Sequence, residues 1–207
     1  MKHIAEILLR RNAVRVSLEP PFQWTSGIIS PVYCDNRLMT GYVLEREQIV
    51  KAYVQKIDEI GWKPTVIAGT ATAAISWAAF VAAEMDLPMV YIRPKPKEHG
   101  AKKQIEGYLP ENSKVVLVED LFSTGGSSIA SAQAIQHEGK SEILGVIAIM
   151  SWELPKCEEN FHRENIPFVS LTGFSEIIPL AAERGSVSRD DVEKILEFRT
   201  NPENWWK

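Results

Sequence analysis

Apolar runs of strand length alternate with segments of helical periodicity through the middle of the chain, and this alternation limits the possible folds more than any other feature. The apolar runs are bounded by polar or turn-forming residues, and they predict strands at residues 65–68, 88–93, 115–118, 143–150 and 167–171. The segments beside them carry apolar residues at helical spacing and predict helices at residues 44–60, 73–85 and 127–138. Strands that alternate with helices are typical of a parallel sheet covered on both faces. The predicted fold class is therefore α/β, with a mostly parallel, twisted sheet flanked by helices.

The two ends of the chain differ from this central part. Residues 4–11 have the spacing of an amphipathic helix, and a short extended piece at 14–16 follows it. The segment 22–37 is rich in aromatic and turn-forming residues, which favours an irregular cap over a site. Near the other end, Ser188 and Asp191 have the spacing of a capping box that starts a last helix.

No internal repeat or linker divides the chain, and 207 residues with 45% hydrophobic content suffice for one full core. We therefore expect a single domain over residues 1–207. Residues 1 to about 40 and about 172–207 are expected to contribute a small hood to it.

The charge and the cysteine content limit the binding partners and the cellular compartment that we expect for the chain. A formal net charge of -4 disfavours nucleic acid as the main partner. The two cysteines, Cys34 and Cys157, have no short metal-type spacing and indicate a reducing compartment. The first ten residues have no apolar core long enough for a signal peptide or a membrane span. We expect a cytoplasmic protein that binds neither nucleic acid nor membranes.

Two adjacent carboxylates, Glu119 and Asp120, follow the apolar run 115–118, and a loop of small and hydroxyl residues, Ser123 to Ser127, follows them. The carboxyl end of a strand is where ligands bind in open α/β sheets. The loop has no Lys after its glycines, and no G-x-G-x-x-G motif follows any strand, which disfavours triphosphate and dinucleotide sites. Backbone N–H groups at a helix start suit a single phosphate, and carboxylates accept hydrogen bonds from sugar hydroxyls. The pattern predicts a ribose 5-phosphate site, although each part alone is also found in ordinary turns.

Residues 93–103 form a strongly basic segment in a chain that is acidic overall. The segment carries five Lys or Arg side chains and one His, together with two prolines and a glycine. Such a segment can be a solvated surface loop, and it can also be an extended, hinged loop that closes over a ligand. Pyrophosphate is the ligand that this charge would suit.

The stretch VVLVEDLFSTGGS at residues 115–127 resembles the phosphoribosyl pyrophosphate signature of the type I phosphoribosyltransferases. Other segments are similar, in matching order, to the orotate-specific branch of that family. They are WTSGIISPVYCDNR at 24–37, AGTATA at 68–73, RPKPKEHG at 93–100, QIEG at 104–107, LPK at 154–156 and NPE at 201–203. The resemblance implies the type I phosphoribosyltransferase fold and covers nearly the whole chain.

The resemblance also implies an activity. Members of this branch transfer ribosyl 5-phosphate from phosphoribosyl pyrophosphate to orotate, which gives orotidine 5′-monophosphate and pyrophosphate on the route to UMP. The implied cofactor is Mg²⁺, held mainly by phosphoribosyl pyrophosphate and water rather than by a dedicated protein site. The implied assembly is a homodimer in which the basic loop of one subunit reaches the site of the other.

The site residues follow from the same resemblance. Lys97 and His99 match the loop positions that contribute to catalysis. The positions matching the phosphoribosyl pyrophosphate site are Thr70, Ala71, Arg93, Lys97, His99, Glu119, Asp120, Leu121, Phe122, Ser123, Thr124, Gly125, Gly126 and Ser127. Ser123 matches the position that contacts orotate.

The chain departs from the family pattern at several positions. Ala74, Ser76 and Trp77 replace residues common after the 69–72 loop. A lysine common at Thr25 and an arginine common near Trp152 are also absent. Arg37 is therefore a candidate for binding the orotate carboxylate, and it is equally a candidate for anchoring the cap or a dimer.

Two other functions compete with this interpretation. A phosphoribosyltransferase for a purine or another base would share the sugar half of the site, but segments 24–37 and 93–100 disfavour it. A phosphoribosyl pyrophosphate-sensing regulator that binds DNA would need a basic helix-turn-helix extension, and only about twenty residues precede the orotate-like segment.

Overall fold

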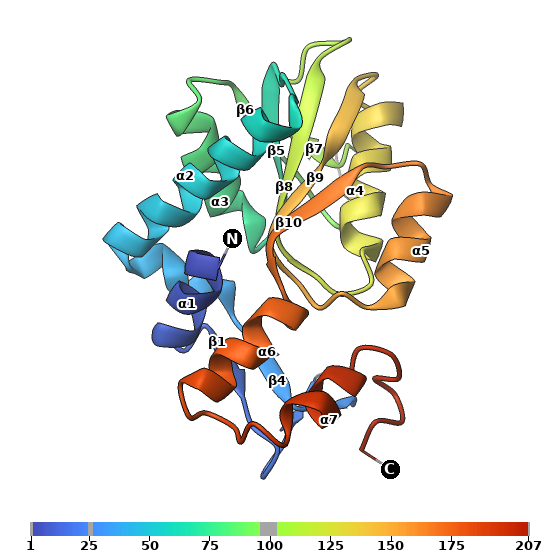
Figure 1. Cartoon of the computed structure of the whole chain (residues 1–207). Helices are drawn as coiled ribbons and strands as arrows, with labels where there is room; N and C mark the ends of the chain where they lie inside the picture. Colours follow the sequence, from blue (N-terminus) through green and yellow to red (C-terminus); the bar gives the residue numbers. More distant parts are fainter. Residues whose placement is uncertain (1, 25–26, 96–102, 207) are drawn as a thin grey trace.

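The computed structural model describes residues 2–24, 27–95 and 103–206 (Figure 1). A sheet with helices on both faces forms the body of the molecule, and a smaller group of strands and helices built from both ends of the chain lies below it in this view. Within the described residues, no helix is long and apolar enough to cross a membrane.

The body is a six-stranded sheet with the spatial order β10-β9-β8-β5-β6-β7. All neighbouring strands are parallel except β6 and β7, which form an antiparallel pair. The strands are β5 (Val66–Thr70), β6 (Met89–Ile92), β7 (Ile105–Glu106), β8 (Lys114–Phe122), β9 (Glu142–Ser151) and β10 (Phe168–Gly173). The strand order places β8 in the interior of the sheet, with β9 on one side and β5 on the other. The predicted α/β class with a mostly parallel sheet is confirmed.

Each face of the sheet packs against its own layer of helices. Val116 and Val118 of β8 belong to a core shared with α1 (Lys2–Arg10), α2 (Val43–Ile60) and α3 (Ala74–Glu84). Val115 and Leu117 point the other way, into a core shared with α4 (Gly126–His137) and α5 (Pro155–Arg163). Successive side chains of a strand alternate between faces, so a strand covered on both faces must be apolar throughout.

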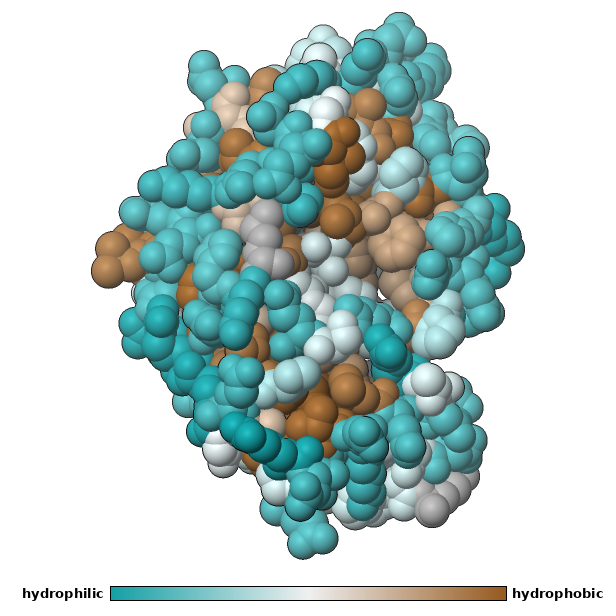
Figure 2. Space-filling model, in the orientation of Figure 1, coloured by the Kyte–Doolittle hydropathy of each residue, from teal (hydrophilic) through white to brown (hydrophobic). Residues whose placement is uncertain are grey.

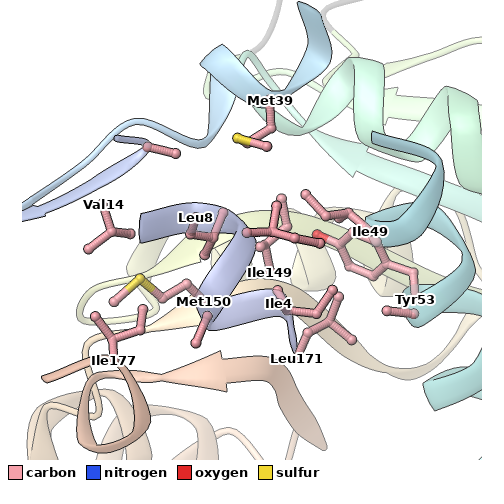
Figure 3. Packing of buried hydrophobic residues seen from close by; sticks show 14 of the residues in the cluster. Ile4, Leu8, Val14, Met39, Ile49, Tyr53, Ile149, Met150, Leu171 and Ile177 are labelled. Atoms are coloured by element: carbon pink, nitrogen blue, oxygen red, sulfur yellow. The ribbon is translucent and has the colours of Figure 1, made fainter. Parts of the chain in front are cut away.

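The first helix closes one of these cores. Figure 3 shows Ile4 and Leu8 of α1 lying among Ile49 of α2, Ile149 of β9 and Leu171 of β10, and all five are buried. Complete burial of a side chain of this size stabilises the fold by about 1.5–3 kcal/mol.

The ends of the chain meet below the carboxyl ends of the strands. The N-terminal part contributes β1 (Val14–Val16), β2 (Phe22–Gln23), β3 (Ile29–Ser30), β4 (Val32–Cys34) and the 3₁₀ helix η1 (Asn36–Gly41). The C-terminal part contributes α6 (Phe174–Glu183) and α7 (Val192–Glu197). Trp24 joins the two parts, because its ring lies 5.7 Å from that of Trp152 and 5.6 Å from that of Phe198. Its indole N–H also donates to the carbonyl of Val32 at 2.9 Å.

Most predicted elements are present with small shifts at their ends. The helix predicted at 44–60 begins at Val43 and ends before Gly61, whose φ of 80° is the left-handed conformation favoured by glycine. The cap predicted at 22–37 is more regular than expected, since it contains three short strands. The last helix begins at Val192, although Ser188 Oγ accepts the N–H of Asp191 at 3.2 Å. The capping box is incomplete. The carboxylate of Asp191 accepts the hydroxyl of Ser188, and among the described hydrogen bonds it does not accept the backbone N–H of Ser188.

Candidate active site

Strand β8 is longer than predicted and carries the acidic pair itself. The sequence predicts a strand over 115–118, whereas β8 continues to Phe122. Pairing with β9 explains the extension: Glu119 lies opposite Ala148, and Leu121 lies opposite Met150. The two carboxylates therefore point to opposite faces of the sheet at its carboxyl end.

Glu119 points toward α4 and is only 4% exposed. One carboxylate oxygen accepts the hydroxyl of Ser128 at 2.9 Å, and the other accepts the N–H of Asp120 at 3.0 Å. Burial, together with the neighbouring charge of Asp120, raises the pKa of Glu119 to about 8. Each oxygen keeps a second lone pair, so the carboxylate can still accept a hydrogen bond from a ligand.

Asp120 lies on the opposite face, where side chains from the N-terminal half of the chain hold the strand. Asn36 Nδ2 donates to the carbonyl of Asp120 at 2.7 Å, and Tyr53 donates its hydroxyl to the carbonyl of Glu119 at 2.6 Å. β5 pairs with β8 only as far as Val118, so these side chains serve carbonyls beyond the end of that ladder. Burial raises the pKa of Asp120, while its own hydrogen bonds and the guanidinium of Arg37 oppose the rise.

The small-residue loop joins β8 to α4. Gly125 is the N-cap of α4, and this N-terminus has no side-chain cap. The first N–H groups of a helix lack intrahelical partners and favour an anion, so the loop can bind a phosphate. Asn160 of α5 donates to the carbonyl of Thr124 at 2.9 Å and fixes the loop against the next helix. The structure thus brings the predicted residues Ser123 to Ser127 directly beside the acidic pair.

Only glycine fits at position 125. Its φ is +78°, and a Cβ atom there would lie 2.6 Å from the ring of Phe161. We expect Gly125→Ala to destabilise the protein by about 2–5 kcal/mol, the sum of left-handed strain and overpacking. Thermal unfolding of the variant measures this loss. Gly126→Ala is the matched control, because a Cβ there meets nothing closer than 3.9 Å; equal losses from the two substitutions would contradict this explanation.

The loop after β5 lies next to the acidic strand. Thr70 is the last residue of β5 and is buried, and the following N–H, that of Ala71, donates to the carbonyl of Ile92 at 2.9 Å. Among the described residues, the hydroxyl of Thr70 has no hydrogen-bond partner. Gly69 is required because a Cβ there would lie 2.7 Å from Ala78 of α3. Ala74, Ser76 and Trp77, which depart from the family pattern, lie in α3, and Trp77 is fully buried in the core.

Arg93 follows β6 directly and marks the base of the basic loop. Its backbone N–H donates to the carbonyl of Gln104 at 2.9 Å, and its guanidinium lies 3.4 Å from the carboxylate of Glu106. The two ends of the loop are therefore pinned together beside the β5 loop. Lys97 and His99, the predicted catalytic residues, lie outside the described residues.

Arg37 lies on η1 near the acidic pair, but its guanidinium is already engaged. Nε lies 2.6 Å and Nη2 lies 2.9 Å from the two carboxylate oxygens of Asp35. This two-bond contact is the geometry in which Arg binds a carboxylate most strongly. Arg37 is thus placed close to the site while being bound to its own segment.

A pocket of about 550 Å³ opens beside the loop after β8. Its walls come from the two ends of the chain and from α5, and its lining includes Trp24, Ile28, Ser123, Lys156, Arg199 and Glu203. The molecular outline in Figure 2 is indented where the body meets the lower part of the molecule. Lys156 and Arg199 were not singled out in the sequence. Lys156 lies in the LPK segment at 154–156 that resembles the family, whereas Arg199, two residues after the end of α7, lies in no such segment.

The chain is similar to known proteins over nearly its whole length. The family model described as "Phosphoribosyl transferase domain" matches residues 43–164, which span α2 to α5. The orotate phosphoribosyltransferase of Streptococcus pneumoniae is 45% identical over 204 residues, covering 99% of this chain and 97% of the relative. That of Listeria monocytogenes is 44% identical over 206 residues, covering 100% of this chain and 98% of the relative. The crystal structure of orotate phosphoribosyltransferase from Aeropyrum pernix superposes with a TM-score of 0.77 at 25% identity, covering 87% of this chain and 98% of that one.

The mostly parallel sheet and the matching family model place the chain among the type I phosphoribosyltransferases. Within that class, the full-length similarity is decisive. The chain belongs to the orotate phosphoribosyltransferase family.

Proposed function

We propose that this protein transfers ribosyl 5-phosphate from phosphoribosyl pyrophosphate to N1 of orotate, a Mg²⁺-dependent step that yields orotidine 5′-monophosphate and pyrophosphate for UMP synthesis. The observation that carries the proposal is the placement of Glu119 and Asp120 at the end of β8, directly before the uncapped N-terminus of α4. This placement puts carboxylates that can accept hydrogen bonds from a diol within eight residues of N–H groups that can bind a phosphate. The full-length similarity to orotate phosphoribosyltransferases indicates that the nucleobase substrate is orotate.

Loss of orotate absorbance tests the proposal directly. The protein is mixed with Mg²⁺, phosphoribosyl pyrophosphate and orotate, and parallel reactions contain adenine, hypoxanthine or uracil. Conversion of orotate alone is expected. Turnover of another base in its place would move the assignment within the family, and sugar-phosphate binding without any turnover would favour a sensor.

Each predicted site residue has its own role in the reaction, and that role depends on where the residue lies. The N–H groups of residues 125–127 bind the 5-phosphate, and the carboxylates of Glu119 and Asp120 accept hydrogen bonds from the ribose hydroxyls. As pyrophosphate leaves, positive charge grows on the sugar carbon, and the negative charge of Asp120 stabilises it. Arg93 with Lys97 and His99 balances the negative charge on the leaving oxygens, and closure of their loop excludes water from the sugar carbon.

Bound Mg²⁺ would neutralise charge on the diphosphate. Within the described ranges, no group of three or more His, Cys, Asp or Glu side chains is arranged to hold a metal. Asp120 offers one carboxylate at the site, and one or two carboxylates with substrate phosphates and water are the ligands that Mg²⁺ usually takes. The available donors therefore fit an ion that arrives with the substrate.

A homodimer is the proposed assembly, and an apolar surface where η1 meets α2 supports it. This surface comprises Leu38, Tyr42, Val43 and Leu44, all exposed, with Leu44 at 72%. Figure 2 shows apolar side chains projecting from the edge of the molecule beside the start of α2. Contiguous apolar residues in the open are typical of a subunit contact.

Leu44→Glu is expected to convert the dimer to a monomer, because a charge would have to be buried without a partner. Light scattering coupled to size exclusion measures the mass. Ile60→Glu is the matched control, since Ile60 is an exposed apolar residue at the opposite end of α2. A dimer that survives Leu44→Glu, or dissociates equally with Ile60→Glu, would place the contact elsewhere.

A further inference from the structure

The pocket beside Ser123 has the walls that a flat, charged base requires. Trp24 and Ile28 form an apolar side, and Trp24 is held in place by its stack on Trp152 and its hydrogen bond to Val32. Ser123 offers a hydroxyl at the end of β8. A ring fixed in this way presents its face to a planar ligand with little further loss of side-chain entropy.

Orotate differs from uracil by one carboxylate, and that group decides what else the pocket must contain. A carboxylate removed from water without a cation or several donors is strongly unfavourable. A cationic donor within reach makes the same transfer favourable through a charge-assisted hydrogen bond. The pocket therefore needs a basic side chain that is able to turn toward the ligand.

Two basic residues line this pocket, and their surroundings differ. Arg199 is tied to the body, because its Nη1 lies 3.2 Å from a carboxylate oxygen of Glu153, which also accepts the N–H of Ser175 at 2.8 Å. Lys156, in the first turn of α5, has a side chain that is 60% exposed, and its ammonium lies 3.4 Å from Glu159. A surface pair at this distance contributes little stability, so a bound carboxylate replaces it at small cost.

Arg37 is less suited to the same task. Nε and Nη2, one edge of its guanidinium, are engaged by Asp35 at 2.6 and 2.9 Å, and Arg37 is not part of the pocket lining.

We propose that Lys156 binds the carboxylate of orotate and thereby sets the preference of the pocket for orotate over uracil. The inference rests on the proposed function, because it identifies the cation that recognises the base in that reaction. Lys156 is a specificity-determining residue in this account, and Arg199 holds the C-terminal wall of the pocket.

The test compares orotidine 5′-monophosphate with uridine 5′-monophosphate, which lacks only the carboxylate. Calorimetric titration of the full-length protein gives the ratio of their affinities. We expect Lys156→Ala to reduce this ratio by roughly 10- to 100-fold, with unchanged uridine 5′-monophosphate binding, and Lys156→Arg to restore most of it. Lys140→Ala, which removes a surface lysine paired with Glu111 at the opposite end of the sheet, leaves the ratio unchanged.

The outcomes separate this proposal from the proposed function. An unchanged ratio in Lys156→Ala overturns it, as does a collapse of the ratio in Arg37→Ala but not in Lys156→Ala. Equal loss of both nucleotides in Lys156→Ala also overturns it, since the effect then does not depend on the carboxylate. A wild-type protein that prefers orotidine 5′-monophosphate through Lys156 but does not convert orotate refutes the activity and leaves the binding assignment standing.

Discussion

Lys97→Ala is expected to lower turnover by about 10²- to 10⁴-fold while the fold remains intact. Lys97 lies in the basic loop whose two ends are joined at Arg93 and Gln104, next to the loop after β5. Negative charge gathers on the leaving pyrophosphate only as the bond breaks. A cation that meets this charge stabilises the transition state more than the ground state, so its loss appears in turnover.

Steady-state kinetics with saturating substrates measures the effect, and thermal unfolding checks the fold. Lys95→Ala is the matched control, because Lys95 is an exposed lysine two positions away in the same loop. Near-normal turnover of Lys97→Ala, or an equal loss in both variants, would remove Lys97 from the chemistry.

Mixing two inactive variants tests whether the loop serves the neighbouring subunit. In a dimer of Lys97→Ala with Asp120→Asn, one site combines an intact loop with an intact acidic strand only if the loop crosses the interface. A 1:1 mixture with random exchange then recovers about a quarter of wild-type activity, since half the dimers are mixed and each has one complete site. Activity that stays at the level of the separate variants would place the loop over its own subunit.

The central sheet was predictable because burial on both faces leaves a simple pattern. Val115 to Val118 are apolar without interruption, and only a strand covered by two helical layers explains this. β2, β3 and β7 were not predicted, because two residues are too few to show a period. Their positions depend on pairing between segments, which a local pattern does not contain.

The residues of the site were predictable from the sequence, but the directions in which their side chains point were not. The order of acids and small residues identified a sugar-phosphate site, yet the strand had to extend to Phe122 before Glu119 and Asp120 were seen to face opposite layers. Arg37 looked available because its pairing with Asp35 depends on the turn at the start of η1. Lys156 belongs to the LPK segment that resembles the family, but only the fold shows that it lines a pocket together with the C-terminal segment.

Glu119→Gln is expected to make the free protein more stable than wild type at pH 8 and to have a smaller effect at pH 5. The pKa of Glu119 is raised from 4.5 to about 8 by burial, so the folded protein keeps a proton that the unfolded chain loses. Between these values the folded state binds more protons than the unfolded state, and stability therefore falls as pH rises. The slope is at most about 1.4 kcal/mol per pH unit. Glutamine is neutral in both states and removes this contribution.

Urea unfolding of both proteins at several pH values between 5 and 8 measures the difference in slope. Glu193→Gln, which removes an exposed glutamate on α7, controls for the change in net charge. Asp120→Asn is a second comparison, because burial also raises the pKa of Asp120 and the charge of Asp120 raises the pKa of Glu119. Parallel slopes for wild type and Glu119→Gln would mean that Glu119 is ionised in the free protein. Divergent slopes would mean that Glu119 is neutral in the free protein. The buried acid would then lower the stability of the fold at pH 8 while keeping a hydrogen-bond acceptor beside the loop at residues 123–127.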